Sequence, residues 1–105
     1  MEGLELISFK IIASVGNARG MFINSIHLAK KGKFKEAKKN IEQGNEFMLE
    51  GSRAHMEVLQ MQTNGENIPF DLLLVHAEDQ MMSAETTKIM AEEMIDLYSI
   101  ILGDK

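Results

Sequence analysis

The sequence predicts an all-α fold, in which residues 1–105 form a single domain built as an antiparallel three-helix up-down-up bundle. Two clusters of turn-forming residues, 30–33 and 63–69, divide the chain into three long segments. Each segment is rich in Met, Leu, Glu and Lys, and its apolar residues recur at steps of three and four, the spacing of one helix face. Because the connections are short, neighbouring helices are expected to run antiparallel.

The first helix is expected over residues 4–31 and the second over residues 34–62. The apolar face of the first comprises Leu4, Ile7, Ile11, Val15, Ala18, Phe22, Ile26 and Ala29. The apolar face of the second comprises Phe34, Ala37, Ile41, Phe47, Met48, Ala54, Val58 and Met61. Gly16-Asn17 interrupts the first helix and is expected to kink it. Gly44 and Gly51 weaken the second helix, each by about 1 kcal/mol relative to alanine.

The third helix is expected over residues 70–102. Pro69 stands near its first helical position, where the missing N–H costs nothing. Asp71 is expected in the first turn, where the helix dipole favours a carboxylate. Gly103 supplies the signal that ends the helix.

Composition and charge exclude several classes of protein. The chain is 45% hydrophobic and 26% charged, and a domain of this size buries only roughly 60–70% of its unfolded surface, so oligomerisation would help it. The absence of cysteine excludes a disulfide framework, a thiol nucleophile and Cys-ligated zinc. The net charge of −5 disfavours nucleic acid as the main partner. No apolar run of about 20 residues predicts a membrane span, and residues 1–5 lack the basic region of a signal peptide, so we expect a cytoplasmic protein.

The expected third helix carries two apolar stripes. The stripe expected to face the other helices comprises Leu73, Ala77, Met81, Ala84, Ala91, Met94, Tyr98 and Ile101. The second stripe comprises Leu72, Val75, Met82, Thr86, Ile89, Leu97 and Ile100. A helix that is apolar on two sides must bury both of them, which a three-helix monomer does not easily do. The pattern therefore favours self-association, and the alternative is that the second stripe widens the core of a single chain.

Asp79 lies on the second stripe, between Val75 and Met82. An isolated buried carboxylate is costly, so such a group is paired, protonated or bound to a metal. In a cyclic oligomer the copies of Asp79 would meet at the axis and repel one another, and a divalent cation would offset that repulsion. Carboxylate oxygens suit magnesium or calcium. In the alternative, Asp79 faces solvent at the edge of the stripe.

His76 precedes Asp79 by three residues, so the two are neighbours on the helix surface. A histidine beside an acid, near the start of a helix, can be a general base, a metal ligand or a phosphorylation site. The alternative is a structural histidine on an apolar face. His27 and His55 have no comparable setting and are expected at the surface or in helix packing. A triad of His76, Asp79 and Ser83 is disfavoured, because the three share one helix face without an evident oxyanion hole.

Six lysines gather around the first turn and the start of the second helix: Lys30, Lys31, Lys33, Lys35, Lys38 and Lys39. We interpret them as a solvated face rather than a nucleic-acid site. The glycines are scattered along the chain and form no phosphate-binding loop.

Residues 74–82, Leu-Val-His-Ala-Glu-Asp-Gln-Met-Met, resemble the V-H-A-Q-D-H-L-M signature of the lactose/cellobiose-specific IIA components of the phosphotransferase system (PTS). Three further elements agree in order and spacing. Residues 16–19 resemble the family's G-[DN]-A-R element, and residues 32–37 resemble its G-D-F-x-x-A turn. Residues 65–69 resemble its second turn. The resemblance extends along essentially the whole chain.

The resemblance implies a homotrimer of three-helix bundles that serves as a phosphocarrier subunit of a sugar PTS. His76 would accept a phosphoryl group from the phosphorylated histidine phosphocarrier protein and pass it to a cysteine of the cognate IIB subunit. Asp79 would line the threefold axis and hold one divalent metal per trimer, with magnesium as the first choice. The sugar would be a β-linked disaccharide, and residues 74–77 are closer to the cellobiose- or chitobiose-type members than to the lactose type.

Several positions depart from the family pattern. Glu78 replaces the usual Gln, and Gln80 replaces a common second histidine. The family's second-helix pattern is E-A-H-x-x-Q-T. In this chain Ser52 stands where the pattern has histidine, and His55 stands where it has Gln. Arg53 is a candidate to face the phosphoryl group instead. These departures support an alternative function, a non-catalytic regulatory or binding homologue with the same trimeric helical fold.

Overall fold

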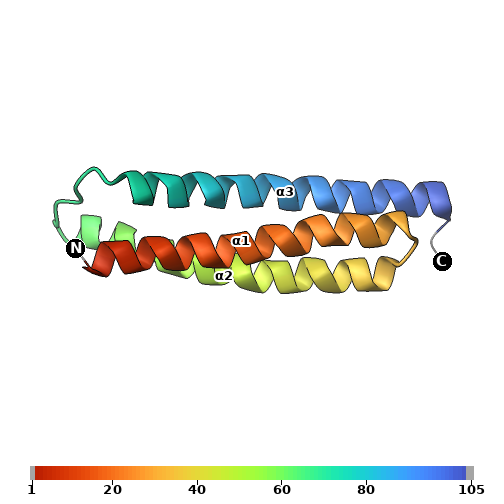
Figure 1. Ribbon diagram of the computed structural model, residues 1–105, viewed down its shortest axis with the longest axis horizontal. Coiled ribbons are helices and arrows are strands. Elements are labelled where there is room, and N and C mark those ends of the chain that lie inside the picture. The colour runs from red at the N-terminus through yellow and green to blue at the C-terminus, as the bar shows by residue number, and fades with distance from the viewer. Residues whose placement is uncertain (1, 104–105) are drawn as a thin grey trace.

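The computed structural model describes residues 2–103, which form three long helices. Helix α1 spans Glu2–Lys30, α2 spans Phe34–Thr63 and α3 spans Leu72–Leu102. The helices lie side by side in a rod of 54 × 19 × 19 Å (Figure 1). Helices α1 and α3 begin at one end of the rod, and the α1–α2 turn lies at the other end, where α3 finishes (Figure 1). The prediction of an all-helical fold with three helices is confirmed.

Three glycines with left-handed backbone mark the predicted breaks. Gly32, Gly65 and Gly103 have φ angles of 75°, 86° and 72°, a region that residues with a Cβ rarely adopt. The backbone N–H of Gly103 donates to the carbonyl of Ser99 at 2.9 Å and ends α3. Gly103 therefore acts as the predicted stop.

The start of α3 differs from the prediction. The helix begins at Leu72 rather than at Phe70, so Pro69 lies outside it and is not near the first helical position. Asp71 is the N-cap residue and not part of the first turn, and its side chain accepts a hydrogen bond from the Leu73 N–H at 2.9 Å. An aspartate that satisfies a free N–H at the N-cap stabilises a helix start more than a proline two residues earlier can.

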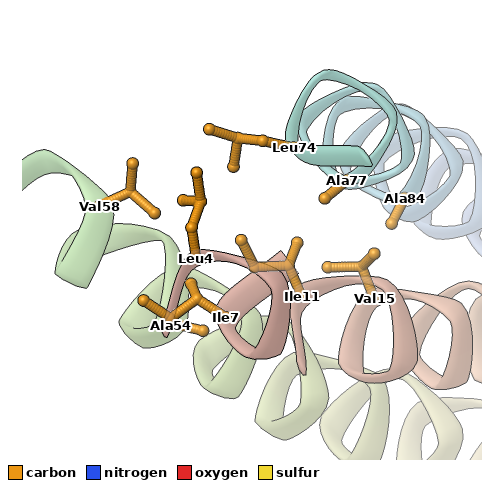
Figure 2. Packing of buried hydrophobic residues seen from close by; sticks show 9 residues of the cluster. All are labelled: Leu4, Ile7, Ile11, Val15, Ala54, Val58, Leu74, Ala77 and Ala84. Carbon is orange, nitrogen blue, oxygen red and sulfur yellow. The ribbon is translucent and has the colours of Figure 1, made fainter. Parts of the chain in front are cut away.

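The core follows the apolar face of α1, which contacts both other helices along its length. One cluster joins the beginnings of α1 and α3 to the end of α2: Leu4, Ile7, Ile11, Val15, Ala54, Val58, Leu74, Ala77 and Ala84 (Figure 2). A second cluster fills the other half of the rod: Ala18, Phe22, Ala29, Phe34, Ala37, Ile41, Ala91 and Ile95. By length and composition α1 is also apolar enough to cross a membrane, but the core helix of a bundle meets the same criterion. The helix continues through Gly16-Asn17 without a break.

The buried glycines of α2 have a packing role that helix propensity alone does not indicate. A Cβ on Gly44 would overlap the ring of Phe22, and a Cβ on Gly51 would lie 2.8 Å from Cγ1 of Val15. Each glycine therefore lets α1 approach α2 closely, which offsets the helix propensity that the glycine costs.

The two apolar stripes of α3 differ in how far they are buried. In the first stripe Ala77, Ala84 and Ala91 are buried as predicted, whereas Ile101 is 64% exposed. Leu74 and Ile95, which we did not assign to that stripe, are buried beside it. The apolar residues of the second stripe remain 45–78% exposed: Leu72, Val75, Met82, Ile89, Leu97 and Ile100. The alternative in which this stripe widens the core of a single chain is therefore wrong.

Candidate functional site

The candidate site lies on the first two turns of α3, where the backbone is held firmly. The Asp71 cap fixes the first turn, and the carbonyl of Asp71 also accepts a hydrogen bond from the Val75 N–H at 3.1 Å. Leu74 and Ala77 are buried and point toward Leu4 and Ile11 of α1 (Figure 2). Leu74 and Ala77 lie on either side of position 76, so they hold the backbone of His76 against α1.

His76 is the fifth residue of α3 and its side chain is exposed. Within residues 2–103 the ring has no hydrogen-bond partner, so both nitrogens are open to a ligand or a reacting group. The ring lines a shallow, mainly apolar hollow of about 490 Å³ together with Leu72 and Leu73. The ring is therefore outside the core of a single chain, and the site is a surface imidazole near the capped start of α3.

Asp79 lies less than one helical turn beyond His76 and is also exposed in a single chain. It has exposed apolar neighbours on the second stripe, Val75 and Met82. In the described part of the chain no three His, Cys, Asp or Glu side chains are grouped to hold a metal ion. A metal site within one chain is therefore not supported, and a site at Asp79 needs ligands from other copies.

A polar link between α2 and α3 was not foreseen from the sequence. Nε2 of His55 donates to Oε2 of Glu78 at 2.8 Å, with 22% and 43% of the two side chains exposed. We had expected His55 at the surface or in packing, and Glu78 only as an added negative charge. Both positions carry Gln in the family pattern, and this chain has a His and a Glu there that contact each other. The sequence signal for this contact is that a basic residue, His55, and an acidic residue, Glu78, both depart from the family pattern.

The other positions that depart from the pattern contribute less to the site. Ser52 and Gln80 are half-buried, on α2 and α3 respectively. Arg53 lines a groove between α1 and α2 with Lys10, and no residue of α3 lines that groove. The expectation that Arg53 faces a group bound at His76 therefore has no support within one chain.

Comparison with known proteins gives consistent matches along nearly the whole chain. Residues 6–99 match the family described as "PTS system, Lactose/Cellobiose specific IIA subunit". The chain is 38% identical over 100 residues to the lichenan-specific phosphotransferase enzyme IIA component of Bacillus subtilis strain 168, covering 95% of this chain and 91% of that protein. It is also 38% identical to the oligo-beta-mannoside-specific EIIA component of the same strain, covering 90% and 86% of the two chains.

A solved structure agrees with these matches. The crystal structure of the PTS cellobiose-specific enzyme IIA from Bacillus anthracis superposes with a TM-score of 0.94 at 34% sequence identity. The superposition covers 100% of this chain and 96% of the other. The likeness therefore includes the third helix and the segment that carries His76.

Proposed function

Because this chain belongs to the lactose/cellobiose-specific IIA subunits of the phosphotransferase system, we propose that it carries a phosphoryl group on His76. The donor is the phosphorylated histidine phosphocarrier protein, and the acceptor is a cysteine of the cognate IIB subunit. The observation that carries the proposal is the exposed ring of His76, which has no hydrogen-bond partner in residues 2–103 and stands on a capped and buried helix start. Two different proteins must reach the same nitrogen in turn, and an exposed ring permits that.

Phosphoryl transfer places few demands on the chain besides position and charge. A lone pair on one nitrogen of His76 forms the new N–P bond while the donor's N–P bond breaks and its electron pair returns to the donor ring. In the second step the thiolate of IIB forms an S–P bond and His76 regains its lone pair. A neutral imidazole is a competent nucleophile near neutral pH. The apolar hollow formed with Leu72 and Leu73 offers a contact for side chains of either partner.

The proposal includes a homotrimer built on the second stripe of α3. The exposed apolar residues of that stripe run along most of the helix, from Leu72 to Ile100. Monomeric proteins seldom leave so long a contiguous apolar strip uncovered. Packing of three copies around this strip would bury it and would bring three copies of Asp79 to the axis.

A divalent cation, with magnesium as the first choice, fits the chemistry of such an axis. One chain supplies only Asp79, but three copies supply carboxylate oxygens, the donor type that magnesium prefers. When bound, the cation would neutralise the repulsion between the carboxylates. The proposal assigns it no role in the chemical step at His76.

The sugar in this proposal is a β-linked disaccharide. Three of the similar proteins are named for lichenan, oligo-β-mannoside and cellobiose, and others are named for lactose. The sugar itself is recognised by the membrane subunit of the system, so the IIA chain need not encode the choice. A cytoplasmic location follows from the same proposal, because both phosphoryl partners act there.

The test is labelling with phosphoenolpyruvate and the general phosphotransferase enzymes. The wild type should acquire one acid-labile phosphoryl group per chain and pass it to the cognate IIB subunit. His76→Ala should abolish labelling, whereas the matched variants His27→Ala and His55→Ala should keep it, because the chain has three histidines. A correctly folded wild type that no general system labels would favour the non-catalytic homologue instead.

A further inference from the structure

Residues 30–39, at the end of the rod opposite the start of α3 (Figure 1), hold more than half of the basic residues of the protein. Six of the eleven basic residues, but only one of the sixteen acidic residues, fall within residues 30–39. This segment therefore has a formal charge of +5, whereas the remainder of the chain has −10. We define the lysine end by five exposed side chains: Lys30, Lys31, Lys33, Lys35 and Lys39. Lys38 is left out because it lines a groove with three carboxylates, those of Glu42, Glu92 and Asp96, whereas Lys33 and Lys39 share a hollow with the single carboxylate of Glu36.

Helix stability does not account for this charge. A lysine at the end of α1, such as Lys30, is favoured by the helix dipole, but one at the start of α2 is not. Lys33 occupies the N-cap of α2 and makes no side-chain capping hydrogen bond there. The family pattern G-D-F quoted above has an aspartate at this position, which is a preferred N-cap residue. The chain has therefore given up a cap and gained a positive charge, with only Glu36 as an acid in the first turn.

Exposed aliphatic side chains occur at the same end. Helix α3 finishes beside the α1–α2 turn (Figure 1), and Tyr98 packs against the core cluster that contains Ala29 and Phe34. The next turn of α3 exposes Ile101 to 64% and Leu102 to 51%. Neither residue was assigned to the second stripe. The tip of the rod thus combines lysines with aliphatic side chains.

We propose that the lysine end docks on an anionic lipid bilayer. A cluster of four or more lysines attracts an anionic leaflet, and each lysine near the surface raises binding about fivefold. Lysine is a flexible and strongly hydrated point charge, which suits a disordered layer of headgroups better than a fixed carboxylate on a protein. The aliphatic side chains of α3 can enter the boundary between headgroups and acyl chains, as in other surface-bound proteins.

The geometry of the rod leaves His76 free in this arrangement. His76 lies 26 residues before Leu102 on α3, which is about 39 Å along the helix axis. Docking by the lysine end therefore does not cover the candidate phosphorylation site. If three chains associate through α3 as proposed above, their lysine ends face the same way and bind together, which strengthens docking without new contacts.

The experiment is co-sedimentation of the full chain with lipid vesicles. Vesicles of phosphatidylcholine alone are compared with vesicles that also contain phosphatidylglycerol, at low and at physiological salt. We expect binding only to the anionic vesicles, and weaker binding as salt rises. The triple variant Lys31→Gln/Lys33→Gln/Lys35→Gln should bind about 100-fold more weakly, since three contributions of about fivefold multiply.

The matched control is Lys10→Gln/Arg19→Gln/Lys88→Gln, which removes three basic residues elsewhere, two exposed and one half-buried, and gives the same net charge. It should bind like the wild type. Equal losses in the two triple variants, or no binding to anionic vesicles at low salt, would overturn the proposal. Salt-sensitive binding to polyglutamate without binding to vesicles would also overturn it and would indicate an acidic protein partner.

Two further measurements separate the parts of the proposal. Leu102→Ser should weaken vesicle binding without altering its salt dependence, because it removes only apolar contact, and an unchanged affinity would contradict an apolar contribution. Labelling of His76 should be the same in both triple variants, which also reports that they are folded. If the wild type is labelled but does not bind vesicles, only the docking proposal fails. If the wild type binds vesicles but is not labelled, only the phosphocarrier function fails.

Discussion

The contact between His55 and Glu78 permits a quantitative test of how the start of α3 is held in place. The contact is a hydrogen bond that joins α2 to the helix that carries His76. Replacing either residue by alanine removes a hydrogen bond of 2.8 Å to a charged acceptor and leaves the other side chain unpaired. His55 is the more buried partner, at 22% exposed, so Glu78→Ala should be the more costly of the two changes.

The expected magnitude follows from the exposure of the pair. Exposed ion pairs contribute about 0.2–1 kcal/mol, and hydrogen bonds to charged groups contribute about 1.5–3 kcal/mol when water is excluded. Because Glu78 is 43% exposed, solvent screens the pair and the coupling should be near the lower range, at about 1 kcal/mol. For a domain of about 100 residues this corresponds to a fall of about 4–8 °C in Tm for Glu78→Ala.

The assay is a double-mutant cycle by denaturant unfolding at one fixed protein concentration. It compares the wild type, His55→Ala, Glu78→Ala and the double variant, with Glu85→Ala as the control for loss of an exposed acid of α3. The control should change stability by less than about 0.5 kcal/mol. If the two single changes add within about 0.3 kcal/mol, the pair is not coupled and the reasoning is wrong. The variant His55→Gln/Glu78→Gln, which places the pattern's Gln at both positions, should recover part of the lost stability.

Three other changes test separate parts of the structure. Asp79→Leu should preserve or strengthen the proposed trimer, because it eliminates repulsion and desolvation of carboxylates at the axis. It should also remove any effect of magnesium or chelator on Tm. Sedimentation that shows dissociated chains would contradict this. In thermal unfolding, Gly44→Ala should destabilise the chain by about 1–3 kcal/mol, because the new Cβ overlaps the ring of Phe22. The control Gly20→Ala should stabilise it by up to about 1 kcal/mol, because a Cβ there meets nothing within 4 Å. Asp71→Ala should cost about 1 kcal/mol of stability, measured in the same way, without preventing labelling of the site, because it removes the N-cap of α3.

Periodicity was sufficient to predict the elements because the helices are long and their connections short. The predicted face of α1 is the core of the protein, since Leu4, Ile11, Val15 and Phe22 are all almost fully buried. The start of α3 was less predictable. The apolar side chain of Phe70 extends the helical pattern backwards, and only the hydrogen bond of Asp71 decides which residue is the first of the helix.

The site could be predicted only in part, for a physical reason. The spacing of His76 and Asp79 is local, so the sequence places them together on one helix. The pairing of His55 with Glu78 spans 23 residues and depends on how two helices rotate against each other, which no local pattern encodes. The need for glycine at position 44 likewise depends on another helix, because a Cβ there would overlap the ring of Phe22 on α1.

The distribution of side-chain sizes on α3 links its packing to its function. The face that contacts α1 is lined largely by Ala77, Ala84 and Ala91, while larger apolar side chains such as Met82 and Ile89 face outwards. Buried apolar area stabilises a fold roughly in proportion to its size, so a single chain leaves much of the stabilising surface of α3 unused. Small residues inside let α3 lie close to α1, and large residues outside remain available for other copies. In the proposed trimer both sides of this helix would be packed, and the outer side is the one that carries Asp79, less than one helical turn from His76.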